Sequence, residues 1–225
     1  MRATLIDYGA GNLPSVEHAL RQLGAATERA TLPEQIDAAT ALVLPGVGHF
    51  GAMMHTLETL QLTRPIRAAL ARKVPFLGIC LGMQALYIAS EEAEGVRGFE
   101  MFPAMVTALP REVRLPHIGW NQVQQVHESR LLRGVPDHSW FYFAHTFAVP
   151  AEPGRTGAKR VLEMRPTAAA PRPVERGAGV VATCRHGHAF VAAVEQENLC
   201  AVQFHPEKSA SAGQQVLRNF LELAR

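Results

Sequence analysis

The stretch Pro75-Phe-Leu-Gly-Ile-Cys80-Leu-Gly-Met-Gln84 predicts a strand, a sharp turn and then a helix. An apolar run over 74–79 favours a buried strand, and a helical pattern follows over 83–88. Glycines stand two residues before and two residues after Cys80, the layout of a nucleophile elbow with cysteine where hydrolases carry serine. Glycine is favoured there because side chains would crowd so tight a turn. We therefore interpret Cys80 as a candidate nucleophile.

A helix that begins at the elbow favours ionisation of the thiol. Its N-terminus carries partial positive charge, which stabilises a thiolate, and the thiolate is the reactive form of cysteine. The alternative is that Cys80 is an ordinary core residue, since cysteine is among the most buried residue types and Gly-x-Cys-x-Gly can arise by chance in an apolar strand.

Composition and charge exclude several classes of function. The 225 residues are 48% hydrophobic and carry a net charge of +2, which favours one α/β domain over residues 1–225 and gives no reason to expect nucleic acid or an anionic membrane as partner. We expect neither a transmembrane helix nor a signal peptide. Cys80, Cys184 and Cys200 form no C-x-x-C pair, so we expect a reducing cytoplasm, with the latter two as core residues.

The order of predicted elements indicates an α/β fold with a mixed, largely parallel central sheet flanked by helices. In the first ninety residues strands alternate with helices, which is typical of a parallel, doubly wound sheet. The strands are expected at 2–7, 25–29, 41–44 and 74–79. One helix is expected after a cap at Asn12 and ends before Gly24, and further helices are expected at 50–60, 65–71 and 83–88. Later strands, separated by turns, predict an antiparallel extension; they are expected at 105–109, 140–149, 180–184, 189–194 and 200–204. A last helix is expected at 213–223, and the Pro- and Arg-rich segment at about 152–179 reads as a surface insertion.

A nucleophilic cysteine needs a base and a group that orients the base. His205 follows the last predicted strand, and Glu207 lies two residues on, where its carboxylate can accept a hydrogen bond from the imidazole. His145, His186 and His188 also flank apolar runs, and a histidine at a strand end is more often structural than catalytic. His186 and His188 lack a third ligand at metal spacing, so we predict no metal site.

Backbone N–H groups can supply an oxyanion hole at the same edge of the sheet. The turn Pro45-Gly-Val-Gly48 follows a buried strand, which makes Val47 and Gly48 candidates, and Leu81 follows the nucleophile as a second donor. The alternative for this turn is an ordinary Pro-Gly turn without function.

Three motifs together resemble the class I (triad) glutamine amidotransferases: Pro45-Gly-Val-Gly-His-Phe-Gly51, Leu77-Gly-Ile-Cys-Leu-Gly-Met-Gln84 and Phe204-His-Pro-Glu-Lys-Ser209. Pro116-His-Ile-Gly-Trp-Asn121 and Tyr142-Phe-Ala-His-Thr146 narrow the resemblance to the glutaminase subunits of imidazole glycerol phosphate synthase. It covers nearly the whole chain except about 152–179, where that family has a shorter link. Phe147 stands where the family often has tyrosine.

The resemblance implies a role for each matching residue. Cys80 would attack the side-chain amide of glutamine, His205 would protonate the departing ammonia, and Glu207 would orient His205. Residues implied to bind the substrate are Gly48, Gln84, Glu92 and Thr146. For Glu92 the alternative is an exposed surface acid. Residues implied to contact a partner are Asn12, Trp120, Asn121, Tyr142 and Lys208.

The partner implied is a (β/α)₈-barrel cyclase subunit in a heterodimer. It would use the ammonia to convert PRFAR into imidazole glycerol phosphate and AICAR in histidine biosynthesis, and no cofactor or metal is implied. One alternative is a subunit of another amidotransferase, serving pyridoxal phosphate, anthranilate or guanylate synthesis; the Gly119-Trp120-Asn121 stretch argues against it. A second is a pseudoenzyme that only binds a partner; an intact Cys80, His205 and Glu207 argue against that.

Overall fold

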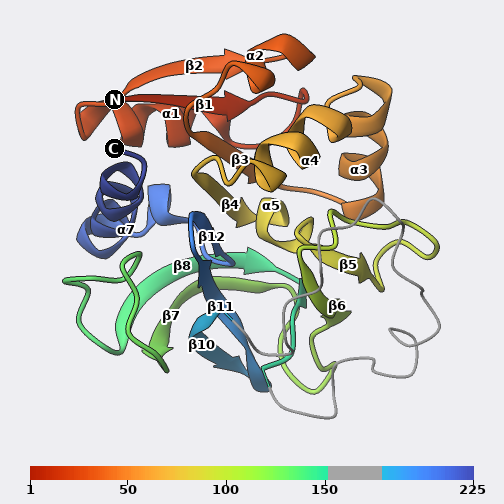
Figure 1. The fold of residues 1–225 in the computed structure, drawn as a ribbon. Coiled ribbons are helices and arrows are strands. Elements are labelled where there is room, and N and C mark those ends of the chain that lie inside the picture. The colour runs from red at the N-terminus through yellow and green to blue at the C-terminus, as the bar shows by residue number, and fades with distance from the viewer. Residues whose placement is uncertain (152–178) are drawn as a thin grey trace.

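The computed structural model describes residues 1–151 and 179–225, and these form a large twisted sheet with helices on both faces (Figure 1). The insertion expected at about 152–179 lies outside the described residues, apart from Gly179. The central sheet has nine strands in the order β2-β1-β3-β4-β12-β11-β10-β7-β8. This is the mixed α/β architecture expected from the sequence.

The first half of the sheet is parallel, as predicted. It consists of β1 (Arg2–Ile6), β2 (Ala26–Ala30), β3 (Leu42–Gly46), β4 (Phe76–Cys80) and β12 (Leu199–Val202). β3 and β4 are buried along their whole length, because helices cover both of their faces. Their register pairs Gly46 with Cys80, so the two strands end side by side at the carboxyl edge of the sheet.

The second half is antiparallel, as predicted, with one strand that was not expected. It consists of β11 (His188–Gln196), β10 (Val180–His186), β7 (His117–Gln125) and β8 (Ser139–His145). Two runs predicted for this extension lie elsewhere: the run at 200–204 forms β12, which pairs in parallel with β4, and the run at 105–109 falls in β6 (Phe102–Ala108) of a separate, smaller sheet. β7 escaped prediction because its residues, HIGWNQVQQ, include few strong strand formers. Its buried and exposed residues nevertheless alternate, and it pairs with β8 over seven positions.

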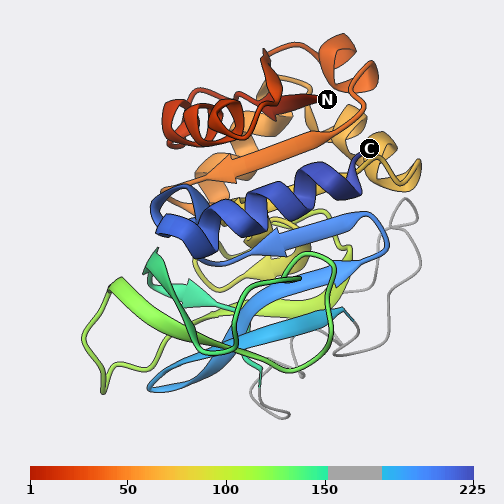
Figure 2. The same cartoon turned by 90° about the vertical axis from the view of Figure 1, so that its left-hand side faces the viewer.

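One group of helices packs on each face of the sheet, and each group forms a hydrophobic core with the sheet. On one face lie α1 (Leu13–Gln22) and α7 (Ala210–Leu223), which contact each other and are seen face-on in Figure 2. On the other lie α2 (Pro33–Asp37), which was not predicted, α3 (Phe50–Thr59) and α4 (Thr63–Ala71). Core residues from the two groups fall into separate clusters, because alternate strand residues point to opposite faces. None of the described helices is long and apolar enough to cross a membrane.

The prediction that the Asn12 side chain caps the first helix is wrong. Asn12 occupies the N-cap position of α1, but its side chain makes no capping hydrogen bond. Its backbone carbonyl accepts from the N–H of Val16 at 3.3 Å, and proline in the first turn removes one of the N–H groups that a cap would satisfy.

The prediction of a six-residue helix at 83–88 is also wrong. The elbow is followed by one helical turn, α5 (Leu81–Gln84), and then by β5 (Tyr87–Ser90), which pairs with β6 (Phe102–Ala108) in a smaller sheet. The apolar residues after the elbow fit a helical period, but segment 98–102 takes up their backbone hydrogen bonds: Phe99 N–H donates to the Ala85 carbonyl at 2.6 Å and Met101 N–H to that of Leu86 at 2.7 Å.

The single strand expected over 140–149 is divided. β8 ends at His145, and β9 (Phe147–Ala148) leaves the large sheet to pair with β6. Thr146, between the two strands, therefore sits where the chain crosses from one sheet to the other, close to the end of β4.

Candidate active site

Cys80 stands at the tip of a strained turn between β4 and α5. Its backbone has φ 54° and ψ −108°, in a region that residues with a side chain rarely adopt. Such strain costs on the order of 1–3 kcal/mol and persists only where the surrounding structure imposes it. The turn holds the residue while the side chain stays 5% exposed.

The glycines around the turn are required by close approach of backbone segments. A Cβ on Gly82 would lie 1.8 Å from the Leu44 carbonyl oxygen, and one on Gly78 would lie 2.8 Å from the Gly82 oxygen. A Cβ on Gly46 would meet the Cβ of Leu81 at 2.8 Å. The elbow is therefore pressed against the end of β3, which brings the Val47–Gly48 loop beside the nucleophile. Gly48 has φ +98°, which glycine adopts without cost.

His205 and Glu207 form a buried, hydrogen-bonded pair after β12. The distance from His205 Nδ1 to Glu207 Oε1 is 2.9 Å, and the two side chains are 4% and 1% exposed. Residues Pro206–Lys208 form a one-turn helix, η1, which brings the carboxylate back to the ring. The backbone N–H of His205 donates to the Tyr142 carbonyl at 2.9 Å, and its own carbonyl accepts from Ser209 Oγ at 2.6 Å.

The electrostatics of this pair favour a charged imidazole. Burial on its own lowers the pKa of His205, but hydrogen bonds to Cys80 and Glu207 and the negative charge on both partners outweigh burial and raise the pKa above its ordinary value. An imidazolium beside a thiolate is the resting pair of many cysteine nucleophiles. The arrangement can supply a nucleophile and a proton donor to one substrate atom.

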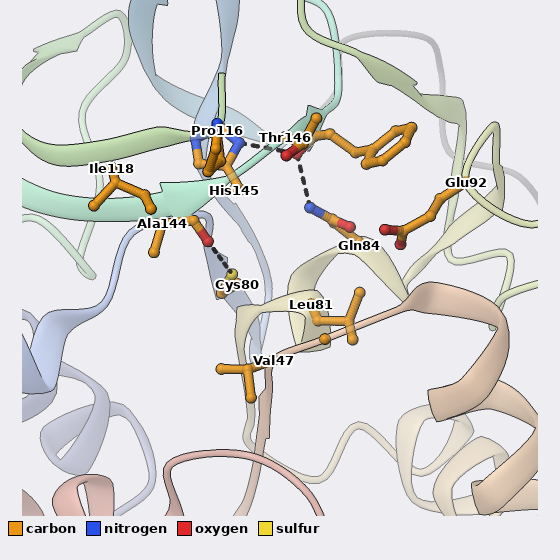
Figure 3. Close-up of a pocket in the computed structure, with 12 residues that line it drawn as sticks. Val47, Cys80, Leu81, Gln84, Glu92, Pro116, Ile118, Ala144, His145 and Thr146 are labelled. Carbon is orange, nitrogen blue, oxygen red and sulfur yellow. Dashed lines mark hydrogen bonds between the residues drawn. The ribbon is translucent and has the colours of Figure 1, made fainter. Parts of the chain in front are cut away.

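The sulfur faces a pocket of about 200 Å³ that opens at the carboxyl edge of the sheet. Seven residues singled out from the sequence line it together: Val47, Gly48, Cys80, Leu81, Gln84, Glu92 and Thr146. In Figure 3 the Cys80 sulfur lies on one side of the pocket, with the Gln84 amide and the Glu92 carboxylate on the other. The volume suits a single small substrate.

Glu92 is not the exposed surface acid of the alternative reading. Its Oε2 accepts a hydrogen bond from the backbone N–H of Phe50 at 2.7 Å, at the first turn of α3. The residue is half-buried and its carboxylate lines the pocket, so it supplies negative charge opposite the sulfur.

Comparison with known proteins decides the family. The family model "Glutamine amidotransferase class-I" matches residues 4–224. The chain belongs to the class I glutamine amidotransferases. Within them it is similar to proteins named imidazole glycerol phosphate synthase subunit HisH. Relatives from Methanothermobacter thermautotrophicus and Moorella thermoacetica are 42% and 40% identical, over 98% of this chain and 98% and 94% of theirs.

Solved structures share the fold of this amidotransferase. A crystal structure described as a glutamine amidotransferase aligns with a TM-score of 0.68 at 19% identity, covering 99% of this chain and 98% of the other. The glutaminase domain of Trypanosoma brucei CTPS aligns with a TM-score of 0.68 at 17% identity, covering 100% and 93%. These identities establish the fold alone.

A hydrogen-bonded series of side chains that the sequence analysis missed, the half-buried Asn121 and the buried His117 and His145, leads from β7 to the pocket of the amidotransferase. The Asn121 NH₂ donates to the Arg185 carbonyl at 3.0 Å, so the same NH₂ meets His117 Nε2, which accepts at 3.2 Å. The proton of His117 is then on Nδ1 and is donated to His145 Nε2 at 3.0 Å, and His145 Nδ1 donates to the carbonyl oxygen of Phe147 at 2.9 Å. Both rings are therefore neutral.

Burial explains why these two histidines stay neutral. It is the main cause that lowers the pKa of His117 to about 4 and that of His145 to about 3, with further lowering from neighbouring imidazoles. His186, which sequence analysis had treated as structural, stacks on His117 with ring centroids 4.2 Å apart. Only the spacing of His117 and Asn121 along one strand could have suggested this hydrogen-bonded series, and that strand was not predicted.

The five residues implied to bind a partner lie outside the pocket, and two of them, Trp120 and Tyr142, share one face of β7 and β8. Trp120 pairs with Tyr142 across the strands, and Lys208 Nζ sits 5.5 Å from the centre of the Tyr142 ring. Trp120 is 50% exposed, and Ile118 and Trp140, which were not predicted, are 62% and 55% exposed. We call Ile118, Trp120, Trp140 and Tyr142 the aromatic face. Asn121 belongs instead to the hydrogen-bonded series with His117 and His145, and Asn12 lies at the start of α1.

Proposed function

We propose that this chain is the glutaminase subunit of an imidazole glycerol phosphate synthase, folded as one amidotransferase domain over residues 1–225. It hydrolyses L-glutamine to glutamate and delivers the ammonia to a cyclase subunit. The observation that carries the proposal is Cys80, held in a strained conformation at a small pocket, together with a buried His205–Glu207 pair in which the pKa shift of His205 depends on Cys80. The names of relatives at 40–42% identity over nearly the full chain support the same assignment.

Cys80 opens the reaction by attacking the δ-carbon of glutamine. The new C–S bond places negative charge on the amide oxygen, and backbone N–H groups of Val47, Gly48 and Leu81 are the donors proposed to stabilise it. As the tetrahedral centre collapses, the C–N bond breaks, and His205 gives its proton to the nitrogen. Ammonia leaves and a γ-glutamyl thioester remains on Cys80.

Water completes the cycle from the same side. His205, now neutral, takes a proton from water as the oxygen attacks the thioester carbon. The C–S bond then breaks, its electron pair returns to the sulfur, and glutamate departs. Glu207 holds the imidazole through Nδ1 in both halves of the reaction, so the nitrogen that faces the substrate is always Nε2.

The far side of the pocket fits the amino-acid end of glutamine. A carboxylate at Glu92 complements the substrate ammonium, and its Oε2 is already oriented by Phe50. Gln84, Gly48 and Thr146 line the same wall. The NH₂ of Gln84 donates to Phe147 and Gln203, so its oxygen is left to accept from the substrate ammonium beside Glu92, and Gly48 and Thr146 provide polar groups for the substrate carboxylate. The distance across a pocket of about 200 Å³ then selects the length of the glutamine side chain.

The aromatic face suits a partner subunit rather than solvent. Exposed tryptophan and tyrosine are typical anchors of protein interfaces, and Ile118 belongs both to this face and to the pocket lining. A (β/α)₈-barrel cyclase seated there, with Asn12 and Lys208 at its margin, would receive ammonia directly from the pocket. We place the heterodimer in the cytoplasm, since it needs neither a membrane nor a cofactor and its cysteines are free.

A glutamine-like electrophile tests the nucleophile directly. An analogue that carries a reactive carbon in place of the amide should modify Cys80 alone, because Cys184 and Cys200 are buried away from the pocket and burial raises the pKa of both. Peptide mapping by mass spectrometry locates the adduct. Modification at another site, or hydrolysis of glutamine by Cys80→Ala, would contradict the assignment.

A further inference from the structure

Gln203 is a buried polar residue that the mechanism above does not use. It lies one residue past β12 and two before His205, and it is 0% exposed. Its backbone N–H donates to the Ala192 carbonyl at 2.9 Å, which fixes the main chain. A fully buried amide side chain is costly unless both of its ends find hydrogen-bond partners.

The orientation of the Gln203 amide is set by its neighbours. Gln84 places its side-chain nitrogen 2.9 Å from the carbonyl oxygen of Phe147, which can only accept, so the group facing that oxygen must be the NH₂. The same NH₂ lies 3.1 Å from Gln203 and must meet its oxygen. The NH₂ of Gln203 is then left for the remaining neighbour, and it lies 3.5 Å from the sulfur of Cys80.

We propose that Gln203 is a further catalytic residue, which donates a hydrogen bond to the Cys80 sulfur and stabilises it as a thiolate. This inference rests on the proposed role of Cys80 as nucleophile. A hydrogen bond to a charged acceptor is about twice as strong as one between neutral groups, so the amide favours the ionised thiol. It acts again when the thioester breaks, because the electron pair of the C–S bond returns to the sulfur that Gln203 faces.

The pH dependence of Cys80 alkylation tests this role without glutamine turnover. Gln203→Met keeps the length of the side chain and removes the donor. With iodoacetamide and peptide mapping, the pH of half-maximal Cys80 alkylation should rise by about one unit, the size expected when a bond to a charged group is lost. Gln215→Met is the matched control, since it removes a paired amide on α7 that bonds Asn219, and its curve should match the wild type. An unchanged curve in folded Gln203→Met overturns the proposal.

A measurement on the wild-type protein covers the case in which Gln203→Met does not fold. In protein labelled with ¹⁵N at glutamine side chains, one NH₂ resonance should titrate with the same midpoint as Cys80 alkylation and should stop titrating in Cys80→Ala. Absence of such a resonance overturns the proposal. If instead the glutamine-like electrophile fails to label Cys80 while both experiments succeed, the proposed function fails and the hydrogen bond stands.

Discussion

Cys80, the proposed nucleophile, has a backbone conformation that is costly for any residue with a side chain. Its φ of 54° is imposed by the contact between the elbow and β3, where added Cβ atoms would collide. The strained residue is thus maintained by the packing of several elements, and stability is exchanged for a fixed position of the sulfur. Catalysis and stability should respond in opposite directions to substitution here.

The pair Cys80→Ala and Cys80→Gly separates these two effects. Neither variant has a thiol, so both should lack glutamine hydrolysis, measured as glutamate release with the cyclase present. Glycine relieves the backbone strain, so the free energy of unfolding of Cys80→Gly should exceed that of Cys80→Ala by about 1 kcal/mol. Equal stability in urea unfolding would contradict the strain; residual hydrolysis would contradict the nucleophile. Cys184→Ala serves as the control that keeps activity.

The neutral histidines predict loss of stability in mild acid. The pKa of His117 falls to about 4 and that of His145 to about 3 in the folded chain, against 6.5 for an ordinary histidine. The unfolded chain therefore binds more protons below pH 6.5, so this stability is complete above 6.5 and is lost as the pH falls towards 4 and 3. Each histidine contributes a slope of about 1.4 kcal/mol per pH unit within that window.

Urea unfolding at pH 7.5, 6.5 and 5 measures this slope. His117→Gln can still accept from Asn121 and donate to His145, but it does not titrate, so the slope between pH 6.5 and 5 should fall by about half. His127→Gln, at an exposed position just after β7, should leave the slope unchanged. A wild-type free energy of unfolding that is flat over this range would show that the two rings are not held neutral.

Among the elements, the strand–elbow–strand unit was predicted in part. The glycine spacing around Cys80 identified the elbow because close packing there admits no Cβ, a demand that is local and visible in the sequence. The helix expected at 83–88 was wrong because its residues satisfy a helical period equally well, and the competing partner, segment 98–102, is distant along the chain. Likewise, β7 depends on pairing with β8 and β10 and not on its own strand propensity. The hydrogen bonds of His117 with His145 and Asn121 depend on β7 in turn.

Glycine at position 82 should be the most sensitive position of the elbow. In Gly82→Ala the new methyl group meets a backbone oxygen of β3 that cannot move without disrupting the sheet, so we expect a loss of about 3 kcal/mol or more in the free energy of unfolding. Gly24→Ala is the matched control: φ is +84° there but nothing lies within 4 Å, so only about 1 kcal/mol of backbone strain is added. Similar losses in both variants would show that the close approach to Leu44 is not restrictive.

At the scale of the whole molecule, the sheet carries the reaction near its centre and the aromatic face at one end. β8 is the edge strand and β2 is the opposite edge. Helices cover both faces of the parallel half, whereas the aromatic face of β7 and β8 is exposed. The resemblance implied Trp120 and Tyr142 as partner residues, and Ile118 and Trp140 lie on the same face only through strand pairing that sequence alone did not reveal.

Trp120→Ala should weaken binding of the cyclase subunit by about tenfold or more in Kd, since tryptophans that a partner covers are frequent hot spots of interfaces. Titration calorimetry with the purified cyclase measures the change. Leu32→Ala is the control, because Leu32 is 51% exposed beside β2 at the opposite end of the sheet. Unchanged affinity in Trp120→Ala, together with a loss of affinity in Leu32→Ala, would indicate that the cyclase binds at the β2 edge of the sheet instead.

In the proposed complex, a cysteine glutaminase on this chain works for a cyclase bound to its aromatic face. The most direct test is the rate of glutamate release from glutamine, measured with the chain alone, with a barrel cyclase subunit, and with that subunit and its sugar-phosphate ligand. We predict slow hydrolysis by the chain alone and strong stimulation by the liganded cyclase, because ammonia released without a partner is wasted. Rapid hydrolysis by the chain alone, or no activity in any of the three conditions with a folded protein, would contradict the account.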